Sequence, residues 1–276
     1  MLSRQISNWD DAYTNGIHIP DGDRWPQAWE EPAHQFRTQL VAQGRAQLDL
    51  AYGDKKRNQL DLFLPEGAPH GLVVFIHGGF WTALDKSYWS HLAAGPLAHG
   101  YAVAMPSYTL CPDIRLSGIV DEIACAIAFA ASKVDGPLML TGHSAGGHLA
   151  ARMACMDAPL PKPVQARIRH VVSISGLHDL RPLIHIPYND TIRLDEEEAQ
   201  AQSPALLQPC KNIRLTCWAG AAERAEFLRQ NELLANIWIG LGARTLAVTE
   251  PDRHHFNIID GLAEPDHPLT LTLLEN

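Results

Sequence analysis

The chain has no apolar run long enough to cross a lipid bilayer. Its longer runs, such as residues 72–76, are far shorter than the roughly 20 residues that a spanning helix needs. Residues 1–13 also lack a basic start followed by an apolar stretch, so we expect no secretory signal peptide. These absences argue against a membrane partner.

Cysteine is scarce, and none of the five residues belongs to a C-x-x-C pair. An odd, scattered set is typical of reduced thiols, which favours a cytoplasmic location. The sequence also lacks H-E-x-x-H, and its paired histidines are badly spaced for a metal: His143 and His148 are five positions apart, whereas His254 and His255 are adjacent. We therefore expect neither a metal ion nor another cofactor.

Basic residues are outnumbered by acidic ones. The 22 Lys and Arg against 31 Asp and Glu give a formal net charge of −9. An acidic surface argues against nucleic acid or an anionic membrane as the partner, which leaves a small-molecule substrate. The oligomeric state stays open, a homodimer included.

Short β-type runs alternate with helical stretches along most of the 276 residues, 46% of which are hydrophobic. Helices are expected at about 87–99, 117–133, 146–156 and 223–240. Strands are expected at 45–52, 59–64, 72–76, 101–105, 137–141, 170–174, 213–218 and 245–248. This alternation predicts an α/β domain, with a mostly parallel sheet of about eight strands and helices on both faces. In such sheets the ligand site lies beyond the carboxyl ends of the strands.

The first 45 residues differ from the rest. They are polar, rich in Trp, Pro and Asp, and show no clear period. We expect residues 1–45 to form an N-terminal arm packed on a catalytic domain of residues 46–276. A small insertion is expected at about 179–205. It could form a partial lid or a solvated loop, and the acidic run 195–198 favours the loop for that run itself.

A Gly-rich turn follows the predicted strand 137–141 and reads GHSAGGH over residues 142–148. The pattern G-x-S-x-G between a strand and an Ala-rich helix is typical of a nucleophile elbow, a sharp turn that strains the serine backbone and lifts its Oγ from the sheet. Glycines flank the serine because a Cβ there would clash with neighbouring backbone. Ser144 is therefore the predicted nucleophile, and a packing turn is the alternative.

A second Gly-rich loop follows the predicted strand 72–76 and reads HGGFW over residues 77–81. Consecutive glycines let backbone N–H groups point at a bound oxygen. Gly78, Gly79 and Ala145 are therefore the predicted oxyanion hole, unless the loop is an ordinary glycine turn. His77 is expected to brace the loop. The predicted substrate-binding residues are Phe80, Trp81 and His143.

The base and the acid are expected in the loops that follow the last two strands, because the order along the chain is nucleophile, acid and histidine. Two adjacent histidines, His254 and His255, follow the last strand. Glu223 is the first carboxylate after the preceding strand and is the preferred acid. Glu226, expected one turn into the next helix and solvated, and Asp252, expected as a surface charge, are its rivals.

Together these residues resemble the kynurenine formamidase (arylformamidase) branch of the α/β hydrolases. HGGFW is similar to that branch's HGG[YF]W loop, and GHSAGGH is similar to its elbow. His255-Phe256 matches its H-F pair, which favours His255 over His254, and the helix that follows Glu223 matches the one that follows the family's catalytic carboxylate. The resemblance spans roughly residues 45–270 and implies the α/β-hydrolase fold. The arm is least recognisable, so substrate-selecting contacts are expected there.

The resemblance implies hydrolysis of N-formyl-kynurenine to kynurenine and formate, a step of tryptophan breakdown. The same groups cleave esters, so a general short-chain carboxylesterase of unknown substrate is the alternative. A third hypothesis is a non-catalytic binding protein on the same fold, which the complete set of candidate groups disfavours.

Overall fold

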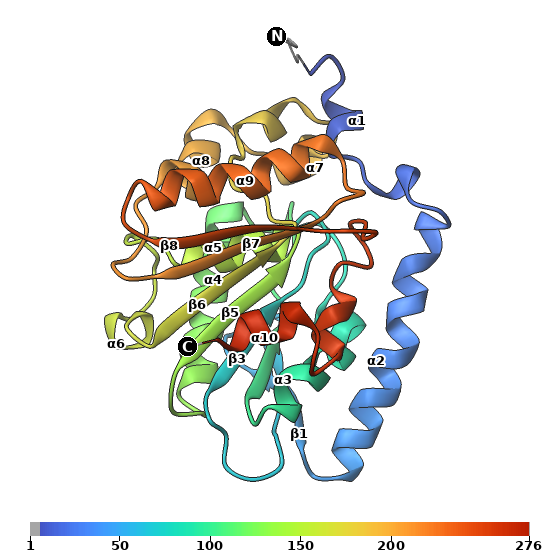
Figure 1. The fold of residues 1–276 in the computed structure, drawn as a ribbon, viewed down its shortest axis with the longest axis vertical. Helices are drawn as coiled ribbons and strands as arrows, with labels where there is room; N and C mark the ends of the chain where they lie inside the picture. Colours follow the sequence, from blue (N-terminus) through green and yellow to red (C-terminus); the bar gives the residue numbers. More distant parts are fainter. Residues whose placement is uncertain (1–5, 276) are drawn as a thin grey trace.

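The computed structural model describes residues 6–275, so residues 1–5 of the predicted arm lie outside the described residues. One sheet has the strand order β1-β2-β4-β3-β5-β6-β7-β8. The strands are β1 (Ala46–Ala51), β2 (Gln59–Phe63), β3 (Leu72–Ile76), β4 (Ala102–Pro106), β5 (Leu138–His143), β6 (Ile168–Ile174), β7 (Arg214–Gly220) and β8 (Arg244–Glu250). β2 runs antiparallel to both β1 and β4, and the remaining neighbours are parallel. The predicted mostly parallel sheet of about eight strands is confirmed, and Figure 1 shows how it runs through the molecule.

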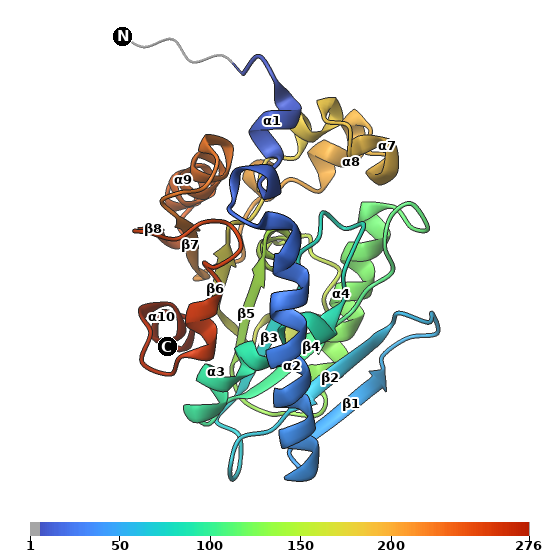
Figure 2. The same ribbon diagram turned by 90° about the vertical axis from the view of Figure 1, so that its right-hand side faces the viewer.

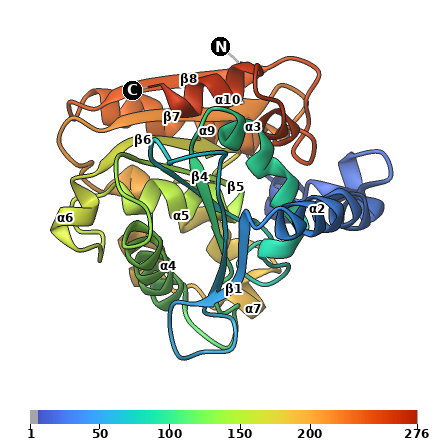
Figure 3. The ribbon, with the colours of Figure 1, turned by 90° about the horizontal axis from the view of Figure 1, so that it is seen from below.

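Helices lie on both faces of this sheet, as Figure 3 shows from below. The α-helices are α1 (Trp9–Tyr13), α2 (Trp25–Ala42), α3 (Ala94–Ala98), α4 (Leu116–Ala131), α5 (Ala145–Met153), α6 (Lys162–Gln165), α7 (Asn189–Ile192), α8 (Glu196–Ala201), α9 (Ala225–Ile239) and α10 (Pro268–Leu274). The short 3-10 helices are η1 (Gly16–His18), η2 (Gly22–Arg24), η3 (Lys86–Ala93), η4 (Arg181–His185), η5 (Pro204–Leu206) and η6 (Asp260–Ala263). None of the helices in residues 6–275 is both long and apolar enough to traverse a bilayer.

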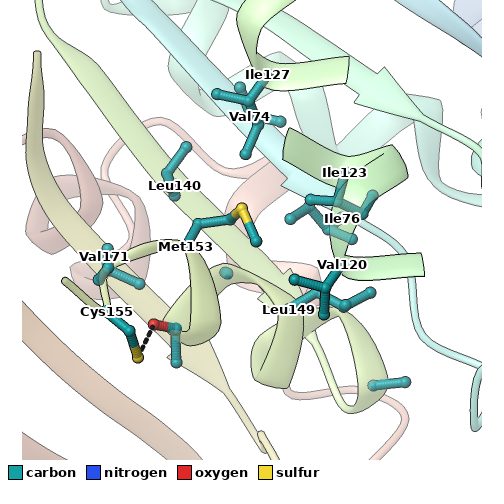
Figure 4. Close-up of a cluster of buried hydrophobic side chains, with 14 of the residues drawn as sticks. Val74, Ile76, Val120, Ile123, Ile127, Leu140, Leu149, Met153, Cys155 and Val171 are labelled. Carbon is teal, nitrogen blue, oxygen red and sulfur yellow. Dashed lines mark hydrogen bonds between the residues drawn. The ribbon is translucent and has the colours of Figure 1, made fainter. Parts of the chain in front are cut away.

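The core is divided by the sheet into two layers, because successive side chains of a strand point to opposite faces. Val74 and Ile76 of β3 belong to the layer under α4 and α5, whereas Val73 and Phe75 belong to the layer under α2 and η3. Figure 4 shows the first layer, where Ile123 and Ile127 of α4 lie beside the β3 side chains. A strand buried on both faces must be apolar throughout, which explains the uninterrupted apolar run 72–76.

Helix α2 corrects the expectation that the arm has no regular period. It runs for 18 residues although Pro32 lies inside it, and proline removes one helical hydrogen bond. Tertiary packing compensates: Trp29 is buried against Trp89, with ring centroids 5.1 Å apart, and Arg37 donates to the Ser90 hydroxyl at 2.8 Å. Figure 2 shows α2 lying along the domain, with the rest of the arm rising to α1.

The segment 179–205 is largely helical, and its acidic run is not a solvated loop. Asp195 caps α8 by accepting a hydrogen bond from the Glu198 backbone N–H. The first turn of α8 is acidic, and its negative charges interact favourably with the positive end of the helix dipole. Glu198 is buried and accepts two hydrogen bonds from the Arg115 guanidinium. The expectation of a loop for the acidic run is therefore wrong.

Candidate active site

Ser144 lies at the sharp turn between β5 and α5, with φ 55° and ψ −116°. This left-handed geometry is strained for a residue with a Cβ. Close backbone contacts maintain the turn: a Cβ on Gly142 would lie 2.3 Å from the Gly146 oxygen, and one on Gly146 would lie 1.9 Å from the Ile76 oxygen. The predicted reason for the flanking glycines is confirmed. Ser144 Oγ forms no hydrogen bond with another described residue, so it is free to meet a ligand.

The structure places all three residues predicted for the oxyanion hole, Gly78, Gly79 and Ala145, near Ser144. Ala145 begins α5, so its N–H has no acceptor within the helix. The N–H groups of Gly78 and Gly79 donate no hydrogen bond to any residue within 6–275. Gly79 has φ 107°, and a Cβ on it would lie 2.4 Å from the Ala83 oxygen, so only glycine fits. A Cβ on Gly78 would meet Ser144 Cβ at 3.3 Å, which shows how closely the loop approaches the elbow.

His77 braces this loop from within the core. Its Nδ1 lies 2.7 Å from the Gly78 oxygen, and its ring stacks on Tyr108 with centroids 4.2 Å apart. Burial lowers the pKa of His77 to about 4, so the ring is neutral and Nδ1 carries the proton that it donates. A neutral, buried ring suits a bracing role and not proton transfer to a substrate.

Phe80 and Trp81 separate in the structure. Both have positive φ, 48° and 59°, so the chain twists sharply between them. Phe80 lines the cavity above Ser144 and stacks on Tyr188, with centroids 4.8 Å apart. Trp81 is fully buried against His148 and does not line that cavity. The expectation that Trp81 contacts substrate is therefore wrong: it anchors the loop to the core.

Glu223 and His255 come together as the sequence predicted. His255 Nδ1 lies 2.7 Å from Glu223 Oε2. The other carboxylate oxygen, Oε1, accepts from Ser175 Oγ at 2.5 Å and from the Gly220 N–H at 2.8 Å. Because the carboxylate can only accept, Nδ1 of His255 carries the proton and Nε2 is left as an acceptor. Ser175 was not among the predicted site residues, although its position directly after β6 is the available signal.

The rival residues face elsewhere. Glu226 accepts a hydrogen bond from the Tyr13 hydroxyl at 2.8 Å and pairs with Arg229. It is therefore buried, whereas the sequence predicted a solvated side chain. Asp252 is exposed. His254 packs edge-on against Trp25 of α2, with ring centroids 5.1 Å apart. None of these three residues takes part in the hydrogen bond that joins Glu223 to His255.

His143 supports the loop that carries His255. Burial lowers the pKa of His143 well below its usual range, and the neighbouring His255 lowers it further, so its ring is neutral. Its Nε2 lies 2.7 Å from the His255 carbonyl oxygen and therefore donates to it. His143 also lines the cavity, so it can both position His255 and touch a ligand.

A cavity of about 740 Å³ opens above Ser144, a volume in the usual range for small-molecule sites. Its floor includes Gly79, His143, Ser144 and His255. The arm contributes one wall through residues between 14 and 29, including the buried Trp29. The cavity thus joins side chains from the carboxyl ends of the strands with a segment from the beginning of the chain.

The family comparisons agree with this architecture. The model of the BD-FAE family matches residues 60–212, more than half of the chain. Kynurenine formamidase of Salmo salar is 30% identical over 248 residues, which cover 85% of this chain and 83% of that protein. The kynurenine formamidase of Danio rerio is 28% identical, covering 83% and 80%.

Solved structures show the same fold. A crystal structure described as a putative thioesterase from Silicibacter sp. TM1040 is 48% identical, with a TM-score of 0.92, and the match covers 96% of this chain and 98% of that one. An esterase of Pyrobaculum calidifontis is 18% identical, with a TM-score of 0.67 and coverage of 96% and 95%, which speaks for the fold alone. The chain therefore belongs to the BD-FAE family and is an α/β hydrolase of the esterase- and formamidase-like type.

Proposed function

We propose that this hydrolase removes a small acyl group from an arylformamide or an ester, with Ser144 as the nucleophile, His255 as the base and Glu223 as the acid. The observation that carries the proposal is the strained Ser144 elbow, which faces the same cavity as the buried Glu223–His255 pair. A serine needs an adjacent base to act as a nucleophile, and the base needs a fixed tautomer.

The reaction follows from these roles. Ser144 Oγ attacks the acyl carbonyl and transfers its proton to His255 Nε2. The oxygen of the tetrahedral intermediate accepts hydrogen bonds from the N–H group of Ala145 and from those of the Gly78-Gly79 loop, each worth about 2.7–4 kcal/mol in comparable sites. His255 then protonates the leaving amine or alcohol, and water releases the acyl group by the same steps in reverse order. Glu223 stays ionised throughout and stabilises the imidazolium of His255.

N-formyl-kynurenine is the preferred substrate within this proposal. Kynurenine formamidases of fish match more than four-fifths of the chain, which supports an arylformamide. Phe80 and Tyr188 stack at the cavity wall and offer an apolar face to an aromatic ring. A short-chain carboxylesterase is the second candidate, because the structural neighbours include esterases and a putative thioesterase.

The test compares kcat/KM for N-formyl-kynurenine with kcat/KM for para-nitrophenyl acetate, butyrate and octanoate, with Ser144→Ala as the blank. A clear preference for the formamide supports a formamidase. Turnover of short esters alone would leave an esterase of unknown substrate. Labelling of Ser144 by a fluorophosphonate probe separates either enzyme from a non-catalytic binding protein, because the probe reacts only with an activated serine.

A further inference from the structure

The two edges of the sheet differ in how they are protected. An edge strand presents unpaired N–H and C=O groups, which natural proteins usually block with a bulge, a proline or a lysine. At the β1 edge the register shifts between Gln47 and Leu50, and Asp49, with φ 55°, pairs with Lys86. β8 pairs with β7 without a register shift, and it carries neither proline nor lysine within Arg244–Glu250. The β8 edge is therefore open to another strand.

Every second residue of β8 turns its backbone groups outward. The Arg244 N–H donates to the Ile213 oxygen, so the even-numbered residues of β8 face β7. Backbone groups alternate in direction along a strand, which turns those of Thr245, Ala247 and Thr249 away from β7. No strand within residues 6–275 lies beyond them, and Figure 2 shows β8 at the margin of the molecule. The outward groups thus form a ladder that lacks its partner.

The sequence of β8 is complementary to itself when it is read backwards. It reads RTLAVTE over residues 244–250. An antiparallel pair of β8 strands from two copies, centred on Ala247, places Arg244 opposite Glu250 of the second copy. Leu246 then lies opposite Val248, and threonine lies opposite threonine. In this register the outward residues form the hydrogen-bonded pairs, so every outward N–H and C=O group of the strand finds a partner.

The side chains favour the same pairing. Arg244 forms no ion pair within residues 6–275, and Glu250 of the second copy offers it a carboxylate that also pairs with Arg253. Leu246 is 51% exposed. Its pair with Val248 is of the non-hydrogen-bonded kind, in which opposite side chains approach most closely. Pairing therefore covers an exposed apolar side chain on each copy and gives a lone cation a partner.

Helix α9 extends the surface on one side of β8. A groove of about 550 Å³ lies between them, and its lining includes Leu233 and Ile239 of α9 together with Thr245 and Ala247. α9 contacts β7 and β8 alike, so it lies over both strands. Because neighbouring strands are about 4.8 Å apart, pairing brings the α9 helices of two copies to about 10 Å from each other, a usual distance for packed helices. Their contact covers Ile239, which is 61% exposed.

We propose that two copies of this chain associate through β8 and α9 as a symmetric dimer, in which the two sheets join into one. The same surface contributes from both copies, and the two-fold axis passes beside Ala247. Because the two β8 strands are antiparallel, the carboxyl ends of the strands, and with them the two cavities, lie at opposite ends of the joined sheet. The dimer is independent of the proposed function, since neither copy supplies a group to the other's cavity.

Sedimentation velocity on the full-length protein over a range of micromolar concentrations tests the association. We expect a species of twice the mass of the chain. Leu246→Lys places an ammonium group opposite Val248 twice in each dimer and should raise the dimer Kd at least about 100-fold, because burying an unpaired charge is costly. Val41→Lys is the matched control. Val41 is similarly exposed, at 48%, but lies on α2 beside the opposite edge of the sheet, so the Kd should not change.

Cross-linking tests the register, and it does so even if Leu246→Lys fails to fold. The background is Cys125→Ser, because Cys125 is an exposed free thiol. In that background Ala247→Cys should be joined to its copy by bis(maleimido)ethane, since the two Cβ atoms lie about 4.5–5.5 Å apart. Thr249→Cys should give no such product, because Thr249 residues of the two copies are about 14 Å apart along the strands, beyond the reach of this linker.

Three results would overturn the proposal. The first is a monomer at every concentration. The second is a dimer whose Kd is the same for Leu246→Lys as for the unaltered chain, which would place the contact elsewhere. The third is a cross-link at Thr249→Cys without one at Ala247→Cys, which would contradict the self-complementary register. None of these results bears on Ser144, whose role is tested by hydrolysis alone.

Discussion

Ser175 and Glu223 are joined by a hydrogen bond of 2.5 Å between Oγ and Oε1, while Oε2 of the same carboxylate meets His255. Ser175 has φ 50°, so it is held in a strained turn directly after β6. We expect Ser175→Ala to lower kcat by about 10–100-fold with KM nearly unchanged, because a hydrogen bond to a charged group is worth about 1.5–3 kcal/mol.

The control for this variant is Ser173→Ala. Ser173 lies two positions earlier, on β6 itself, is equally buried, and its Oγ meets His178 Nε2 at 3.3 Å instead of the carboxylate. Steady-state kinetics on both proteins measures the difference. Equal losses of kcat in the two variants would mean that Ser175 only packs the strand end.

Glu223 and Glu226 can be told apart by matched substitutions. Glu223→Gln should lower kcat by on the order of 10⁴-fold, since an amide cannot hold His255 in the tautomer that leaves Nε2 as an acceptor. Glu226→Gln should leave kcat within about tenfold and lower the free energy of unfolding by about 1–3 kcal/mol, because it weakens the contacts with Tyr13 and Arg229. Urea unfolding measures the free energy of unfolding of each variant, and steady-state kinetics on a single substrate measures its kcat. The reverse pattern would reassign the acid.

Gly146→Ala should prevent the sharp turn at Ser144 from forming. Its Cβ would lie 1.9 Å from the Ile76 carbonyl oxygen, and backbone at that position cannot move aside. We expect a loss of roughly 3 kcal/mol or more in the free energy of unfolding, together with loss of esterase activity. Gly240→Ala, where the nearest atom would be 3.4 Å away, is the control and should unfold like the unaltered chain. A stable Gly146→Ala protein would contradict the close packing of β3 against the elbow.

Stability should fall in mild acid because several histidines are buried and neutral. Burial lowers the pKa of His77 and His148 to about 4 and that of His178 to about 3. The unfolded chain binds protons on these rings as the pH falls through about 6.5, whereas the folded chain resists until about pH 4. The free energy of unfolding is therefore unaffected by these histidines above pH 6.5, and it falls as the pH drops from 6.5 to 4.

Thermal unfolding at several pH values between 7 and 4.5 measures this loss. We expect the protein to take up at least about two protons on unfolding near pH 5.5. Asp260 opposes this uptake in part, because burial raises its pKa to about 6 and it releases a proton on unfolding. His148→Gln should flatten the pH dependence, and the exposed His34→Gln should not. A Tm that does not change over this range would rule out neutral buried histidines.

The sequence was informative where a pattern is local. The uninterrupted apolar run of β3 and the G-x-S-x-G turn depend on neighbours within a few residues, and both were predicted with their positions. Helix α2 was missed because Pro32 and a weak apolar stripe hide it, and its stability comes from partners such as Trp89 that lie far along the chain.

The site residues show the same division. Glu223 and His255 could be chosen from the order of strands and a family resemblance, but Ser175 could not, because its role depends on a partner 48 positions away. Trp81 was predicted to line the cavity together with Phe80, but the two consecutive side chains, both at positive φ, lie on different sides of the loop, and Trp81 packs in the core. In turns with positive φ, such as those at Phe80 and Ser175, the periodicity of the sequence does not predict which way a side chain points.

The composite cavity has a consequence for how this enzyme can change over time. The groups proposed for bond cleavage sit on strand ends that the sheet holds rigidly, whereas one wall belongs to the arm, which enters the cavity from residues 14–29. Substitutions in the arm can therefore alter the choice of ligand without disturbing the proton transfers at Ser144. Part of the cavity lining can therefore vary in sequence while the strand ends that carry Ser144 and His255 are kept.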